Sequence, residues 1–127
     1  MEIANFIHGK KVAAADGQTT DIVDPSSGEV YATAPLSRDA DIDAAFQDSA
    51  RAFESWRDTT PSERQRALLR IADAFEERAE ELVEIESQNT GKPKQLTMEE
   101  EVPPMCDQIR FFAGAARVLE ASRPAST

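Results

Sequence analysis

The spacing of apolar residues changes after Ser37, and this change most constrains the fold of the chain. Before it, short apolar runs alternate with turn residues, whereas beyond it apolar side chains recur every three or four positions in successive segments. Such a recurrence places side chains on one stripe of an α-helix. The sequence therefore predicts an α+β fold, with strands and turns over 1–35 and three or four amphipathic helices over 36–120.

The first hairpin is predicted to pair Asn5–Ile7 with Lys11–Ala13 across His8-Gly9-Lys10, because two short runs flank a glycine. His8 is the single histidine and Cys106 the single cysteine of the chain. They lie too far apart in sequence to form a metal-ligand motif. We therefore interpret His8 as a turn residue.

The second hairpin is predicted to pair Thr20–Val23 with Glu29–Pro35 across residues 24–28. Within that connection Pro25 presets one backbone dihedral and Gly28 tolerates a positive φ. These backbone preferences, and not only the polar composition, predict a turn here. Strands and turns are thus expected to end at about residue 35.

The first helix is expected to start at Ser37, whose hydroxyl can cap the N-terminus. Asp39 and Asp41 then lie near the positive end of the helix dipole. The helix needs a partner surface for its inward stripe. That stripe consists of Ile42, Phe46, Ser49, Phe53 and Trp56.

The second helix has a strong start signal at Thr60-Pro61-Ser62-Glu63. Threonine can cap, proline suits the first helical position, and glutamate at the third position can bond back to the amide of the cap. We expect a break between Glu77 and Glu81, an end near Asn89, and a left-handed Gly91 that closes the helix. Its apolar face is Leu68, Ala72, Phe75, Ala79, Leu82 and Ile85.

The last helix is expected to begin near Pro103 and to contain Cys106. A reactive thiolate requires a cation, a metal or a helix N-terminus, and only the last of these applies. A buried structural thiol is the favoured interpretation, because free cysteines are commonly buried. The apolar stripe of this helix is Met105, Ile109, Phe112, Ala116 and Leu119.

The chain carries 24 acidic and 14 basic residues, a net charge of -10. Without a basic cluster this charge excludes nucleic acid and anionic membrane surfaces as partners. The acidic pairs are interpreted as solvated helix faces, since adjacent helical residues point in different directions. A single cysteine, with no signal peptide or long apolar run, predicts a cytoplasmic protein.

No reaction is visible from the residues alone. Gly91-Lys92-Pro93 lacks both the preceding glycine and the following hydroxyl residue of a phosphate-binding loop. The dinucleotide pattern of three closely spaced glycines is also missing. We therefore predict neither a catalytic nor a cofactor-binding residue within the chain.

Several short motifs follow one another along the chain. They are Phe6–Lys10, Val23–Pro25 with Gly28, Ala44–Phe46 leading to Trp56, Glu63-Arg64, Leu82–Glu86, Asn89–Pro93 and Arg110–Ala116. In this order they resemble the N-terminal region of the aldehyde dehydrogenase superfamily. The resemblance covers about residues 5–120 of this sequence, and its version of the later motifs looks most like the γ-aminobutyraldehyde and betaine aldehyde branch.

The resemblance implies that residues 1–120 are the N-terminal part of the α/β NAD-binding domain of such an enzyme. Family members oxidise an aldehyde to a carboxylic acid through a cysteine thioester, with NAD or NADP as the hydride acceptor. Their catalytic residues and dinucleotide-binding units lie downstream of the matching region. Cys106 does not match the motif of the nucleophile, so this chain is expected to be inactive alone.

The resemblance also implies a monovalent cation site. In many members main-chain carbonyls before the proline turn, here those of Ile22 and Val23, bind the ion together with a side chain before Thr-Gly-Lys, here Asn89. A further ligand comes from a part of the enzyme beyond this sequence. The alternative is that Asn89 is an ordinary helix-end residue.

After Glu120 the sequence departs from the family pattern, and 121–127 is expected to be an unrelated disordered tail. We interpret the chain as a gene product that is cut short or shifted in frame, or as one shortened for expression. Two hypotheses follow from this. One is an inactive segment of an oxidoreductase, and the other is an interaction module that binds a full-length aldehyde dehydrogenase or a complementary segment. Either self-association or the missing remainder would cover its apolar stripes.

Overall fold

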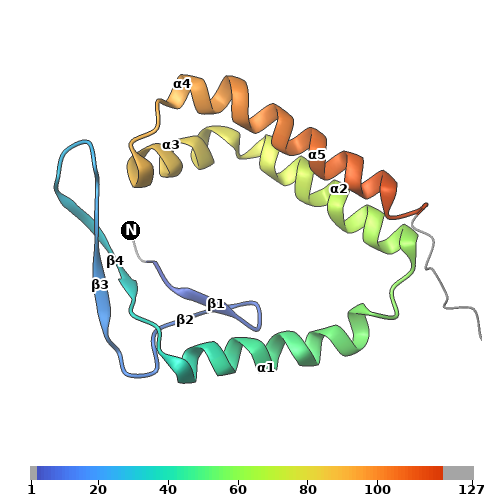
Figure 1. Ribbon diagram of the computed structural model, residues 1–127, viewed down its shortest axis with the longest axis horizontal. Helices are drawn as coiled ribbons and strands as arrows, with labels where there is room; N and C mark the ends of the chain where they lie inside the picture. Colours follow the sequence, from blue (N-terminus) through green and yellow to red (C-terminus); the bar gives the residue numbers. More distant parts are fainter. Residues whose placement is uncertain (1–2, 119–127) are drawn as a thin grey trace, which may run out of the picture. The chain divides into compact units, whose positions relative to one another are not determined.

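The computed structural model describes residues 3–118, and its elements confirm the predicted α+β class. Two antiparallel strand pairs come first and helices follow (Figure 1). Among the described residues, 3–58 with 85–92 form one unit, and 59–84 with 93–118 form another. The elements are β1 Asn5–Ile7, β2 Lys10–Val12, β3 Thr19–Val23, β4 Val30–Pro35, α1 Asp39–Trp56, α2 Pro61–Glu77, α3 Ala79–Thr90, α4 Lys94–Leu96, the π-helix η1 Thr97–Glu101 and α5 Val102–Ala115.

The first hairpin has a tighter turn than predicted. β1 pairs with β2 so that Ile7 lies opposite Lys10, which leaves only His8 and Gly9 in the turn. Both have a positive φ, 52° and 68°. Two successive positive φ values match the twist of the flanking strands, so two residues suffice. The second strand therefore begins at Lys10, one residue before the predicted start.

The second hairpin is confirmed, with small shifts at its ends. β3 begins at Thr19, which lies opposite Pro35, and β4 begins at Val30. Glu29 instead closes the turn, because its carbonyl accepts the Asp24 N–H at 2.9 Å. The Glu29 carbonyl therefore belongs to the turn, and the strand begins one residue later, at Val30.

The cap predicted for α1 is wrong by one residue. Arg38 occupies the cap position, and its N–H donates to the Asp41 carboxylate at 2.9 Å. The Ser37 hydroxyl is instead engaged with the side-chain amide of Asn5, at 2.9 and 3.1 Å. A long-range hydrogen bond has thus replaced the local one on which the prediction rested.

The predicted start and break of the second helix are both confirmed. The Glu63 N–H donates to the Thr60 hydroxyl at 3.3 Å, and the Thr60 N–H donates to the Glu63 carboxylate at 2.7 Å. This backbone hydrogen bond is the main reason why the pKa of Glu63 lies below its ordinary value. α2 ends at Glu77, and Arg78 leaves the helical conformation before α3 begins.

The last helix, α5, begins at Val102, which confirms the predicted start near Pro103. Proline has no N–H and its ring collides with the carbonyl four residues earlier, so Pro103 and Pro104 prevent regular hydrogen bonding with the preceding turn. The backbone accommodates them with the π-helical turn η1, in which the Val102 N–H donates to the Thr97 carbonyl. The sequence did not predict the short α4 and the π-helical turn η1 that precede α5.

The core of the second unit lies between α2 and α5, which run side by side in Figure 1. Ala72 and Ala113 are 0% exposed and Cys106 is 1% exposed. Small side chains at these positions let the two helices approach closely. At the edge of this contact, the Arg110 guanidinium reaches Glu76 at 2.6 Å and Asp73 at 2.9 Å.

The stripe of α1 is exposed, as is Phe112 on α5, whereas Phe75 is half-buried on α2. Exposed fractions reach 72% for Phe46 and 57% for Phe53. Apolar residues on one helix face normally pack against a partner surface. Within residues 3–118, no helix combines the length and the apolarity that crossing a membrane would require.

Candidate functional site

The predicted cation ligands lie in the first unit, on β3 and at the end of α3. Ile22 pairs with Ala32 and Val23 pairs with Val30, so Tyr31 is an extra residue that forms a bulge between them. The Tyr31 hydroxyl donates to the Asn89 side-chain oxygen at 3.2 Å. The structure thus brings Asn89 to the hairpin that carries Ile22 and Val23.

The end of α3 is shaped by Gly91, which has the predicted positive φ, 76°. A Cβ added there would lie 3.3 Å from the Pro25 side chain, so glycine also permits close contact with the β3–β4 turn. The Gly91 N–H donates to the Ser87 carbonyl at 2.8 Å, and the Ser87 hydroxyl donates to the Lys92 carbonyl at 2.7 Å. These bonds fix the backbone that follows Asn89.

Asp24 is the carboxylate next to the predicted ligands, but its own turn occupies it. It accepts the Ser26 N–H at 2.8 Å and the Ser26 hydroxyl at 2.5 Å. The hydroxyl is the largest cause of the lowered pKa of Asp24. The Asn89 amide and the two main-chain carbonyls therefore remain the candidate donors, and such oxygens suit a hard cation. Cation binding stays a prediction.

Within residues 3–118, no three side chains of His, Cys, Asp or Glu gather in a way that could hold a metal ion. The described strands form antiparallel pairs only. Gly9, Gly17 and Gly28 have a positive φ and lie in the first unit. A Cβ added at any of the three would meet no atom within 4 Å, so none of them marks a close backbone approach. A dinucleotide cradle instead needs a glycine-rich turn between a parallel strand and a helix. Residues 3–118 contain no such strand, turn and helix arrangement for a dinucleotide.

The two side chains considered for chemistry are placed as the sequence predicted. Cys106 is buried on α5, as predicted, and its role as a structural thiol stays an interpretation. His8 occupies the β1–β2 turn. It also forms hydrogen bonds with Asp48 of α1, 40 positions away. No local sequence pattern predicted this contact.

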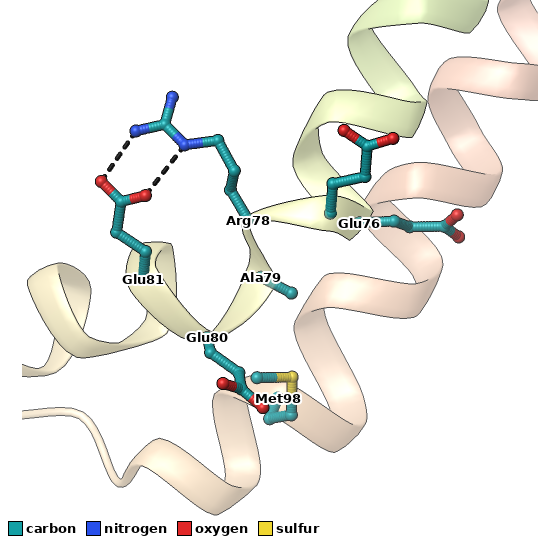
Figure 2. A pocket seen from close by; sticks show the side chains of 7 residues that line it. Glu76, Arg78, Ala79, Glu80, Glu81 and Met98 are labelled. Atoms are coloured by element: carbon teal, nitrogen blue, oxygen red, sulfur yellow. Dashed lines mark hydrogen bonds and ion pairs between the residues drawn. The ribbon is translucent and has the colours of Figure 1, made fainter.

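A surface hollow lies at the junction of α2 and α3, where Arg78 and Glu81 face each other (Figure 2). The guanidinium donates to the carboxylate through two bonds of 2.7 and 2.9 Å. These bonds lower the pKa of Glu81 and raise that of Arg78. The remaining lining includes Glu76, Glu80 and Met98, and it provides no converging set of catalytic groups.

The sequence from residue 12 to residue 126 matches the model of the aldehyde dehydrogenase family. 2-Aminomuconic semialdehyde dehydrogenase from Homo sapiens is 37% identical over 116 residues, which are 91% of this chain and 23% of that protein.

Two solved structures are also similar. The complex of PnpE, from Pseudomonas sp. WBC-3, with nicotinamide adenine dinucleotide has a TM-score of 0.92 at 36% identity. The NAD+ complex of an aldehyde dehydrogenase from Bacillus cereus has a TM-score of 0.89 at 32% identity. Each comparison covers 99% of this chain and 26% of the other.

The chain spans about a quarter of the length of the relatives it matches. The narrower resemblance to the γ-aminobutyraldehyde and betaine aldehyde branch stays a prediction. The family itself is shown by the match over nearly the whole sequence and by the agreement of the fold with solved members. The chain belongs to the aldehyde dehydrogenase family.

Proposed function

We propose that residues up to about 120 supply the N-terminal part of the NAD-binding domain of an aldehyde dehydrogenase, and that the chain does not turn over substrate alone. The family match from residue 12 to residue 126, over about a quarter of the length of its relatives, is the observation that carries this proposal. The complete enzyme would oxidise an aldehyde to a carboxylic acid with NAD or NADP. The solved relatives in complex with NAD support this cofactor class.

The substrate class we propose is an amino-substituted aldehyde. The resemblance to the aminobutyraldehyde branch points to it, and the name of the human relative also specifies an amino-substituted semialdehyde. Cys106 supports the proposed inactivity of the chain. At 1% exposure its sulfur is closed off from a substrate carbonyl, which a thiolate nucleophile must reach.

The proposed role of α1 is docking onto the rest of the enzyme. Phe46, Phe53 and Trp56 expose large apolar surfaces on one element. Burial of each side chain is worth roughly 1.5–3 kcal/mol, so a partner surface would add substantially to a stability of about 5–15 kcal/mol. The same face could join two copies of this chain, which is the competing occupant.

A turnover assay tests the proposed function. We expect no NADH absorbance when the purified chain is mixed with NAD and 4-aminobutyraldehyde. We expect absorbance to appear when the complementary downstream segment of a related dehydrogenase is added, because that segment carries the nucleophile and the dinucleotide site. The downstream segment alone is the control. Turnover by the chain alone would refute the proposed inactivity.

The second candidate function is a non-enzymatic module that binds a full-length aldehyde dehydrogenase or a complementary segment. The exposed stripe of α1 favours it, because binding requires only that surface. Co-purification with the downstream segment without restored turnover would support this module over the enzyme segment. Failure of the two to associate would contradict both proposals.

We also propose that the carbonyls of Ile22 and Val23 and the amide of Asn89 contribute to a monovalent cation site. Titration with potassium chloride should shift the NMR signals of Tyr31 saturably, since its hydroxyl contacts the Asn89 oxygen. Choline chloride at matched ionic strength and the Asn89→Ala variant serve as controls. An equal response to choline, or an undiminished response in the variant, would show that no such site exists.

A further inference from the structure

The sequence contains a single Asp-Gly pair, Asp16-Gly17, and the pair lies in the β2–β3 connection, residues 13–18 (Figure 1). Glycine has no Cβ to shield its amide nitrogen, so this nitrogen can reach the side chain of a preceding aspartate more easily than that of any other residue. Both residues are exposed, and a Cβ added at Gly17 would meet no atom within 4 Å. The pair is therefore open to water and free of steric cover.

The chemistry available to such a pair is an internal dehydration followed by hydrolysis. The Gly17 nitrogen forms a bond to Cγ of Asp16, and its proton leaves with the hydroxyl of the protonated carboxyl group as water, which yields a cyclic succinimide. Water then opens the ring. Cleavage between nitrogen and Cγ restores aspartate, whereas cleavage between nitrogen and the main-chain carbonyl carbon gives isoaspartate. The mass of the chain is unchanged, and the reaction requires no oxidant, reductant or cofactor.

In the folded chain the attacking nitrogen is occupied. The Gly17 N–H donates to the Ala14 carbonyl at 2.9 Å, which closes a turn around residues 15 and 16. The φ of Gly17 is 70°, a left-handed conformation that glycine adopts without strain. Because ring closure removes the proton that this bond uses, the turn must open before the nitrogen can react.

The Asp16 carboxylate is held as well. Its Oδ1 accepts the Gln18 N–H at 2.9 Å, and its Oδ2 lies 3.7 Å from Nε of Arg38. An aspartate that bonds the amide two residues further on stabilises a turn of its own. Rotation of the side chain towards the Gly17 nitrogen therefore requires that these contacts break.

The β2–β3 connection is also tied to α1. The Ala15 N–H donates to Asp41 Oδ1 at 2.8 Å. Ala14 is 6% exposed and Asp41 is 8% exposed, so this attachment is sheltered, whereas the Asp16-Gly17 pair that follows it is not. Release of Ala15 by Asp41 would free the connection directly before the reactive pair.

We propose that Asp16-Gly17 is a latent isomerisation site, which the folded β2–β3 connection keeps unreactive and which forms isoaspartate once α1 releases the connection. Each group that must move is held by a bond that a local opening can break. Isoaspartate routes the main chain through Cβ and Cγ, so the Gly17 and Gln18 amides lose their spacing to the acceptors before them. The modified connection cannot re-form these bonds, and the change persists after the opening has ended.

The reaction uses only residues of this connection and needs no other part of an aldehyde dehydrogenase, so it is independent of the proposed function. Incubation of the full chain in heavy-oxygen water at neutral pH tests it. Each passage through the succinimide adds one solvent oxygen to residue 16, whichever bond opens. Peptide mass spectrometry after digestion in ordinary water measures this label and the isoaspartate fraction.

Label at Asp16 should accumulate at least about tenfold more slowly in the folded chain than in the chain unfolded by urea, a factor that corresponds to about 1.4 kcal/mol of local opening. Isoaspartate at residue 16 should appear in parallel with the label. Equal rates in the two states would show that the fold does not protect the pair. Absence of label from the unfolded chain would show that the pair is not a reactive site.

Asp41→Ala is the variant that releases the connection. It should raise the labelling rate at Asp16 about threefold or more under native conditions, towards the rate of the unfolded chain. Asp41→Asn keeps an oxygen for the Ala15 N–H, so it should give a smaller rise, and it remains informative if the alanine variant does not fold. Asp43→Ala, an exposed position of α1, is the matched control and should leave the rate unchanged. A rate in Asp41→Asn no higher than in Asp43→Ala, with helical circular dichroism retained in both, would overturn the proposal.

Discussion

Replacement of Asp41 by alanine should lower the free energy of unfolding by roughly 2–4 kcal/mol, the largest effect we expect of a single substitution. The side chain is 8% exposed and accepts two backbone N–H groups, from Ala15 at 2.8 Å and from Arg38 at 2.9 Å. It thereby joins the β2–β3 connection to the first turn of α1. Alanine would leave both donors without a charged acceptor in a part-buried setting.

Urea denaturation measures this change as a shift of the midpoint at constant slope. Asp41→Asn should cost about half as much, because the amide keeps one oxygen acceptor and nearly the same shape. Asp43→Ala is the control, since Asp43 lies in the same helix but is exposed. Equal losses in Asp41→Ala and Asp43→Ala would show that the buried hydrogen bonds contribute nothing specific.

Ala113→Leu should destabilise the second unit by about 1–3 kcal/mol or more, because its added atoms have no space. Ala113 on α5 and Ala72 on α2 are both 0% exposed, and Cys106, also on α5, is 1% exposed. A larger side chain would force α2 and α5 apart and weaken the whole contact, including the ion pairs of Arg110. Thermal unfolding followed by circular dichroism should show a lower midpoint.

Gly114→Ala is the matched control one position away. A Cβ added at Gly114 meets no atom within 4 Å, and the residue lies inside α5. Alanine there should stabilise the helix by about 0.5–1 kcal/mol, through the smaller backbone entropy lost on folding. If Ala113→Leu were as stable as Gly114→Ala, close packing of α2 on α5 would be refuted.

Short sequence patterns were sufficient for the elements whose cause is local. The capping bonds between Thr60 and Glu63, the break after Glu77 and the left-handed Gly91 each depend on residues at most a few positions apart. Hydrogen-bond donors, ring constraints and backbone freedom act within such a window whatever the rest of the chain does. The same reasoning located the start of α5 near Pro103 but missed α4 and the π-helical turn η1, which lead into the two prolines.

For the candidate site, the sequence motifs indicated the family and Asn89, but not the contact that positions it. Tyr31 and Asn89 are 58 positions apart, and their hydrogen bond depends on a β-bulge that no spacing announced. Ile22 and Val23 would bind the cation through main-chain carbonyl oxygens, which every residue has, so their side chains do not mark them as ligands. Only the family resemblance suggested them.

The sequence by itself determined the order and type of the elements, the main turns and the family, because these follow from local propensity and ordered motifs. Only the tertiary structure decided that Asp41 binds the Ala15 amide, that His8 binds Asp48, and that Ser37 binds Asn5 instead of capping α1. These pairs are 26, 40 and 32 positions apart. A polar side chain near several donors takes the partner that folding brings within reach, and that choice depends on the packing of the whole unit.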